Sequence, residues 1–181
     1  MLTILTVIGL VLAAAIAVLL LLAMRQPDSF SYARSIVIPA PADRIFPFIA
    51  DPVTFNTWNP FNESQNIKGT YSGPTRGPGA RYSFESKREG TGYTEIVEEH
   101  APSHLVVRLV MTKPFACDNR VDFHLEPVPE GTRVTWAMSG PMTFLSKIMN
   151  QVMNCERMCG TQFTRGLEKL KALVEREQIA A

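Results

Sequence analysis

The three histidines of the sequence are the residues best suited to proton transfer. His100 and His104 flank a predicted turn at residues 101–103, and His124 lies near Asp122 in a segment of alternating polarity. An imidazole acts as a general acid or base where a hydrogen-bonding partner holds it against a substrate. Spacing alone places no such partner beside these histidines, so we interpret them as surface residues and predict no catalytic residue.

Three cysteines, Cys117, Cys155 and Cys159, could instead bind a metal ion or form a disulfide. Cys155 and Cys159 are four residues apart in a helical pattern and could supply half of a metal site. No second pair of Cys or His at zinc-finger spacing completes that site. An odd number of cysteines without the spacing of a disulfide framework indicates free thiols, which suit a reducing compartment. We therefore predict neither a metal ion nor another cofactor.

No other pattern in the sequence assigns a reaction. There is no Ser-His-Asp arrangement, and the glycine-rich loop at residues 73–79 contains prolines, which lack the N–H groups needed to cradle phosphate. Tyr82 and Tyr93 could donate hydrogen bonds to a ligand, although packing alone would also explain them. The net charge of +1, without a basic stripe of interleaved aromatics, argues against a nucleic-acid partner.

The first residues of the chain have the composition of a membrane-spanning helix. Residues 2–24 contain no charge and no proline, and at about 1.5 Å per residue they would cross a hydrocarbon core of about 30 Å. A cleaved signal peptide would need a basic start and a shorter apolar stretch. We predict a retained anchor at residues 1–25 and a linker at 26–29. Arg25, Arg34 and Arg44 follow the apolar stretch, which favours a cytoplasmic location for the remaining residues.

The order of strand and helix signals in residues 30–181 predicts one α+β domain. Residues 30–38 have the β-branched and aromatic content of a strand, and residues 42–50 and 53–58 predict two short helices. Six further strands at hairpin-like spacing indicate an antiparallel sheet of about seven strands. Residues 143–178 then predict a long helix that covers the sheet; Gly160 and Gly166 mark a kink, a break near Asn154, or a close approach to the sheet. The six predicted strands are residues 65–71, 80–86, 93–100, 104–112, 116–127 and 133–140.

The space between the sheet and the long helix has a predicted lining. One helix cannot fill the space over a curved sheet of this size from edge to edge. We therefore expect a cavity whose rim is closed by the two short helices. A dry core is the alternative, although methionines near the last strand and the last helix favour a pocket, because thioethers adapt to irregular ligands. The predicted ligand-binding residues are Trp58, Phe84, Leu105, Val107, Leu109, Met111, Phe123, Trp136, Met138 and Phe163.

Four stretches of the sequence carry a resemblance to a known superfamily. They are RSIVIPAPADRIFPFIADPVTFNTWNPF, YSGPTRGPGARYSFES, GTRVTWAMSG and FTRGLEKLKALVE. Together they resemble the SRPBCC superfamily, and within it the bacterial polyketide cyclase/dehydrase and lipid-transport branch, whose relatives include START lipid-transfer domains. The resemblance covers residues 30 to about 178. It implies a helix-grip fold, in which a curved sheet wraps a long C-terminal helix around a hydrophobic cavity.

Three functions remain open at this point. The apolar inward faces and the anchor predict a protein that binds or transports a hydrophobic small molecule or lipid, as a single-pass protein of a bacterial inner membrane. The resemblance also allows an enzyme of the polyketide cyclase/dehydrase type that acts on an aromatic or apolar substrate. The third alternative is a protein-interaction module similar to activators of a chaperone ATPase. Fold resemblance alone does not decide among these functions.

Overall fold

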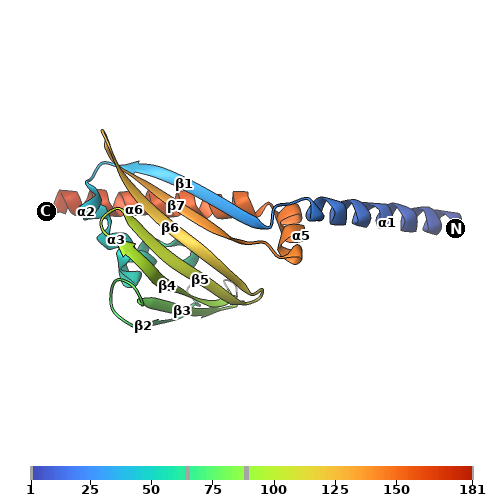
Figure 1. The fold of residues 1–181 in the computed structure, drawn as a ribbon, viewed down its shortest axis with the longest axis horizontal. Coiled ribbons are helices and arrows are strands. Elements are labelled where there is room, and N and C mark those ends of the chain that lie inside the picture. Colours follow the sequence, from blue (N-terminus) through green and yellow to red (C-terminus); the bar gives the residue numbers. More distant parts are fainter. Residues whose placement is uncertain (1, 64–65, 88–89, 181) are drawn as a thin grey trace.

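The computed structural model describes residues 2–63, 66–87 and 90–180 (Figure 1). Helix α1 (Leu2–Met24) projects from one end of an α+β domain, and almost all of its described side chains are exposed. Among the described helices, only α1 is long and apolar enough to cross a membrane, a property that signal sequences share. Residues 25–28 connect it to the first strand.

A seven-stranded antiparallel sheet forms the body of the domain, as predicted. The strands are ordered β1-β7-β6-β5-β4-β3-β2, so the first strand pairs with the last. Gln65, at which we predicted the second strand to begin, lies outside the described residues. The strands are β1 (Ser29–Ile38), β2 (Lys68–Ser72), β3 (Arg81–Ser86), β4 (Gly90–His100), β5 (His104–Lys113), β6 (Cys117–Val128) and β7 (Gly131–Pro141).

The described residues between β1 and β2 form four short helices. They are α2 (Ala42–Ile45), α3 (Pro47–Ala50), α4 (Pro52–Trp58) and the 3-10 helix η1 (Pro60–Asn62). The prediction of one continuous helix at residues 42–50 is wrong: Pro47 has no N–H to continue the hydrogen-bond ladder and starts a new helix instead. Asp51 then caps α4, because its Oδ1 accepts a hydrogen bond from the Val53 backbone N–H at 2.8 Å.

The C-terminal helical segment is also divided. Helix α5 (Phe144–Met153) ends at Asn154, whose φ of +47° is left-handed, and α6 (Cys155–Ala180) begins immediately afterwards. Asn tolerates this conformation better than most residues, and its side chain accepts from the Arg157 N–H to start α6. Two of the three explanations left open for Gly160 and Gly166 are confirmed: the break lies at Asn154, and Gly166, which remains inside α6 like Gly160, closely approaches Trp136 of the sheet.

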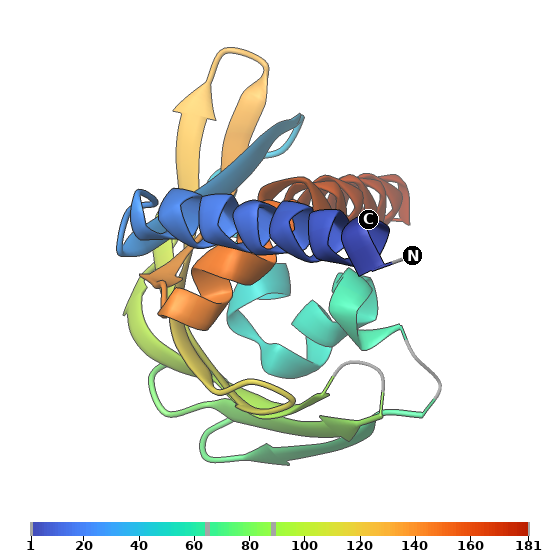
Figure 2. The same ribbon diagram turned by 90° about the vertical axis from the view of Figure 1, so that its right-hand side faces the viewer.

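Helix α6 lies along the concave face of the sheet (Figures 1 and 2). Seen from the α1 side, the sheet curls below and beside the short helices α2–α4, with α6 above them (Figure 2). The core forms where these three layers meet, and its α6 residues recur at helical spacing. These α6 residues are Phe163, Leu167, Leu170 and Val174.

Candidate ligand-binding cavity

A cavity of about 380 Å³ remains between the concave face of the sheet, α4 with η1, and the first half of α6. This volume falls within the range of small-molecule sites, which are mostly apolar clefts of about 300–1,000 Å³. Aromatic, aliphatic and methionine side chains make up most of its wall. The apolar wall includes Phe55, Phe61, Ile67, Phe84, Ile96, Val107, Leu109, Met111, Val121, Phe123, Trp136, Met138 and Phe163.

Period-two alternation places most of the predicted residues on this wall. Eight of the ten predicted ligand-binding residues line the cavity: Phe84, Val107, Leu109, Met111, Phe123, Trp136, Met138 and Phe163. Leu105 and Trp58 do not line it; both are buried in the hydrophobic core. Whether any of these residues contacts a ligand stays a prediction.

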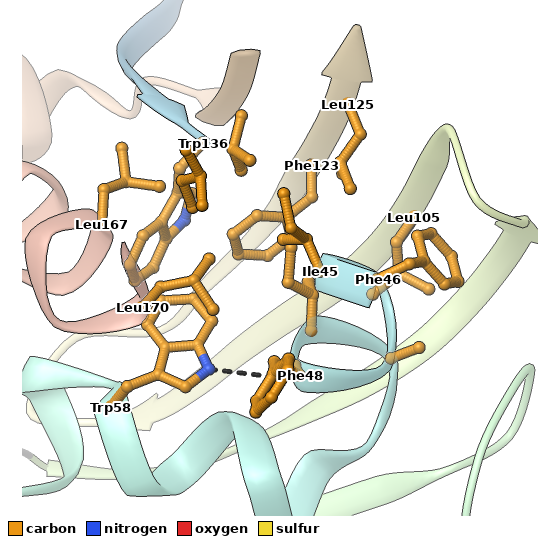
Figure 3. Packing of buried hydrophobic residues seen from close by; sticks show 14 of the residues in the cluster. Ile45, Phe46, Phe48, Trp58, Leu105, Phe123, Leu125, Trp136, Leu167 and Leu170 are labelled. Atoms are coloured by element: carbon orange, nitrogen blue, oxygen red, sulfur yellow. Dashed lines mark hydrogen bonds between the residues drawn. The ribbon is translucent and has the colours of Figure 1, made fainter. Parts of the chain in front are cut away.

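Trp58 is buried in the core, and its neighbour Phe55 lines the cavity instead. The Trp58 Nε1 donates a hydrogen bond to the Phe48 carbonyl at 2.9 Å (Figure 3). The Phe55 ring packs edge-on against Trp58, with centroids 4.7 Å apart, and also faces Trp136 at 5.9 Å. Phe55 was not among the predicted residues, although its position one helical turn before Trp58 could have indicated that both lie on the same face of α4.

The ionisable groups at the cavity wall are held neutral or turned away. The Tyr82 hydroxyl donates to Asn62 Oδ1 at 2.7 Å, and burial raises its pKa. Burial likewise raises the pKa of the Cys159 thiol. Glu95 is among the residues that border the cavity, but its carboxylate accepts a hydrogen bond from Arg81 at 2.6 Å on the opposite face of the sheet. Tyr93 also lies on that face, with the Arg81 guanidinium 4.0 Å above its ring, so it is not a cavity donor.

Two buried polar atoms of cavity-lining residues have no hydrogen-bond partner in the described part of the chain. They are Asn119 Oδ1, an acceptor, and Trp136 Nε1, a donor. Both residues line the cavity, and Asn119 is only 8% exposed. Leaving a buried polar group unpaired costs about 1–3 kcal/mol, so a partner at either atom would be favourable. The alternation of β6 could have identified Asn119, because it lies two residues before the inward-facing Val121.

None of the three histidines lines the cavity. His100, His104 and His124 lie on the strands β4, β5 and β6. Phe123 and Leu125 flank His124 in β6, and both are buried on the concave side of the sheet. The histidines are therefore on the outer, convex face, as the sequence pattern indicated.

Comparison with known proteins adds a family match to this geometry. The sequence profile of the polyketide cyclase / dehydrase and lipid transport family matches residues 29–175. Protein MLL2253 from Mesorhizobium loti has a similar fold, with a TM-score of 0.59 and 16% identity over 81% of this chain and 98% of that chain. No curated protein matches the sequence at a significant level.

Two further solved structures share the fold. The Aha1 dimer from Colwellia psychrerythraea gives a TM-score of 0.58 at 16% identity, over 81% of this chain and 96% of that chain. DynU16, a protein in the dynemicin biosynthetic locus, gives a TM-score of 0.57 at 17% identity, over 83% of this chain and 48% of that chain. At such identities the similarity shows a common fold, and the activity has to be argued from the cavity.

Proposed function

Because the chain belongs to the polyketide cyclase/dehydrase and lipid transport family, we propose that its domain binds or transports a hydrophobic small molecule or lipid at a membrane. The observation that carries this proposal is the apolar cavity of about 380 Å³, which lies between the sheet and α6. A water-filled space of this composition is unfavourable, because its walls expose apolar surface. An apolar ligand would remove that surface from water.

The two unpartnered polar atoms narrow the class of ligand. Asn119 Oδ1 would accept a hydrogen bond from a hydroxyl or an N–H group, and Trp136 Nε1 would donate one to a carbonyl or hydroxyl oxygen. A few polar groups in an apolar pocket fix the orientation of a ligand. The proposed ligand is therefore a mostly apolar molecule that carries at least one such oxygen, rather than a pure hydrocarbon.

The proposal includes a membrane location, because α1 is long and apolar enough to cross a bilayer. It acts as a retained single-pass anchor, with the domain on the cytoplasmic side, as the following arginines favour. The cavity lining reaches the α5 end of the domain, through Met111 near the end of β5, Met138 near the end of β7 and Cys159 near the start of α6. A ligand that leaves the bilayer would reach the cavity from this end.

An acid–base enzyme has less support from the same geometry. A cyclase would need ionisable groups that converge on the substrate. In the described residues, the cavity offers the Tyr82 hydroxyl and the Cys159 thiol, and burial favours the neutral form of both. No specific observation favours the chaperone-activator alternative, because the likeness to Aha1 extends to the fold alone.

Native mass spectrometry of the full-length chain, extracted gently in detergent, tests the proposal. We expect a co-purifying apolar compound, and the protein mass also tells whether residues 1–24 are retained. Leu109→Trp would fill the cavity and displace the compound, whereas Val110→Trp, on the other face of β5, should retain it. A wild-type protein without bound compound, or equal occupancy in the two variants, would contradict the proposal.

A further inference from the structure

His104, His124 and Asp122 form a cluster on the convex face of the sheet, on the side opposite the cavity. We propose that this cluster binds a divalent transition-metal ion of the zinc type. The site is independent of the proposed ligand cavity and of the membrane anchor.

Strand register brings the cluster together. His100 pairs with His104 across β4 and β5, and His104 pairs with His124 across β5 and β6, so the three imidazoles form a row on one face. The imidazole rings of His104 and His124 are nearly parallel, and their centroids are 4.2 Å apart. Asp122 shares this face because it lies two residues before His124, and its Oδ1 is 2.9 Å from Nε2 of His104.

The spacing of the donor atoms is close to what a metal ion requires. One ligand atom from each of His104, His124 and Asp122 lies within 4.8 Å of the other two. In a tetrahedral zinc site with bonds of about 2.0–2.1 Å, the ligand atoms are about 3.4 Å apart. To bind one ion, the two stacked imidazoles have to tilt, because the lone pair of a ring nitrogen lies in the plane of its ring. The 2.9 Å contact between His104 Nε2 and Asp122 Oδ1 has to open at the same time. Two imidazole nitrogens and one carboxylate oxygen suit zinc and its neighbours, and leave the fourth position to water.

Neighbouring charges leave the cluster with a negative balance. Arg120 opposes a cation, because its Nε donates to Asp122 Oδ2 at 2.9 Å and its Nη2 to Oδ1 at 3.0 Å. Glu98 lies 3.5 Å from the same guanidinium, so two carboxylates share one arginine. Burial opposes ionisation of Asp122, but hydrogen bonds from Arg120 and His104 outweigh it and hold the pKa of this carboxyl below its usual range. The carboxylate is thus ionised, as a metal ligand must be, and a metal ion has to compete with Arg120 for its oxygens.

His100 provides a matched control within the same row. Its ring centroid is 6.1 Å from that of His104, and it is not one of the three clustered donors. It is exposed, as is His124, so alanine at either position removes an imidazole without opening a cavity in the core. The chain contains only three histidines, which makes each imidazole signal assignable by substitution.

The test is a titration of the full-length chain in detergent with Zn²⁺ alone, followed by the imidazole carbon–proton signals in NMR. We expect the signals of His104 and His124 to shift together and to saturate at one ion per chain, with a smaller change at His100. Because the readout is the imidazole signal, zinc bound by the three cysteines would not imitate this result. Absence of a shift at His104 and His124 would overturn the proposal.

Variants give a second, quantitative readout in the same titration. His124→Ala is expected to weaken zinc binding by about tenfold or more, and His100→Ala by less than about twofold. Arg120→Gln should tighten binding, because it removes the cation that competes for Asp122. An equal loss in His100→Ala and His124→Ala would show uptake by any surface imidazole and would refute a defined site.

Discussion

At the scale of single residues, the unpaired atoms of Asn119 and Trp136 lower the stability of the ligand-free fold but offer hydrogen bonds to a ligand. A folded protein normally pairs its buried polar groups, and a group left unpaired costs about 1–3 kcal/mol. The Asn119 side chain makes one weak contact, from Nδ2 to Cys117 Sγ at 3.4 Å, while its Oδ1 has no partner among the described residues. Such a cost is typical of positions that serve a ligand rather than the fold.

Asn119→Leu tests this interpretation, because the two expected effects have opposite signs. The variant should raise the free energy of unfolding of the ligand-free protein by about 1 kcal/mol. Leucine is similar in size to asparagine but has no buried carbonyl that lacks a partner. It should also weaken binding of the co-purifying compound. Denaturant unfolding and native mass spectrometry measure the two effects. Tyr82→Phe is the control, because its hydroxyl is already paired with Asn62 and its loss should destabilise the fold. A less stable Asn119→Leu protein would contradict our interpretation.

Residue patterns predicted most of the cavity wall but not its ends. Alternation in β5–β7 correctly identified Val107, Phe123 and Met138 as inward residues, because a strand has only two faces. It could not separate Leu105 from Val107, since both point inward and only the position of the covering layers decides which one is sealed in the core. Sequence spacing also failed to place His104 beside Asp122, because their contact depends on the register between β5 and β6.

At the scale of elements, the strands were easier to predict than the helix boundaries. The strands follow from turn signals and alternation, and their antiparallel order follows from short connections. The two helix breaks have different causes: Pro47 lacks an N–H, a signal the sequence contains, whereas Asn154 adopts a left-handed conformation that few sequence signals specify. The break at Pro47 was therefore predictable. The break at Asn154 was only one of three explanations considered for the glycines of the C-terminal helix.

The two glycines of α6 predict a contrast between matched substitutions. A Cβ atom at Gly166 would lie 2.7 Å from Cζ3 of Trp136 and 3.0 Å from Cδ of Pro60, both parts of rigid rings. At Gly160 the Cβ would meet the end of the flexible Arg34 side chain. We expect Gly166→Ala to destabilise the fold by about 1–2 kcal/mol, through overpacking, despite the higher helix propensity of alanine.

Gly160→Ala is the control for this contrast, and should be neutral or stabilising by up to about 1 kcal/mol. Denaturant unfolding of both variants measures the difference. Equal effects would mean that helix propensity alone decides the stability of α6, and that the close approach of Gly166 to the sheet is unimportant.

Helix α5 contacts the segment before β1 through an ion pair between the buried Lys147 side chain and the exposed Asp28 carboxylate. Lys147 is 7% exposed and donates a hydrogen bond to Asp28 at 2.5 Å. This hydrogen bond and the charge of Lys147 hold the pKa of the Asp28 carboxyl below its usual value. A carboxyl whose pKa is lower in the folded state stabilises the fold above its unfolded pKa, and that contribution disappears as the pH falls through the lowered pKa.

Acidification below about pH 4 should therefore loosen α5, and Asp28→Asn should do so at neutral pH. Amide hydrogen exchange across residues 144–153, corrected for the intrinsic rate at each pH, measures this loosening. Asp118→Asn is the control, because Asp118 pairs with Arg108 on the exposed face of the sheet. Unchanged protection of α5 in Asp28→Asn would show that Lys147 is held by other contacts.

At the scale of the whole molecule, α5 and α1 meet at the same end of the domain (Figure 1). The Met142 N–H donates to the Asp28 carbonyl at 2.7 Å, and Asn150 contacts Gln26 at 3.4 Å, so α5 is tied to the segment that follows α1. Phe144 and Leu145 at the start of α5 are half exposed. If α1 spans a bilayer, these apolar side chains lie at the height of the membrane surface, where burial in lipid would stabilise them.

Fluorescent labels at two positions test this orientation in the full-length chain reconstituted in lipid nanodiscs. With the three native cysteines replaced by serine, an environment-sensitive dye at Leu145→Cys should be quenched strongly by nitroxide-labelled lipids. The same dye at Glu130→Cys, in the β6–β7 hairpin at the end away from α1, should be quenched little (Figure 1). Equal quenching at both positions would mean that the domain does not hold a fixed orientation. In that case a ligand would have to reach the cavity through water rather than directly from the bilayer.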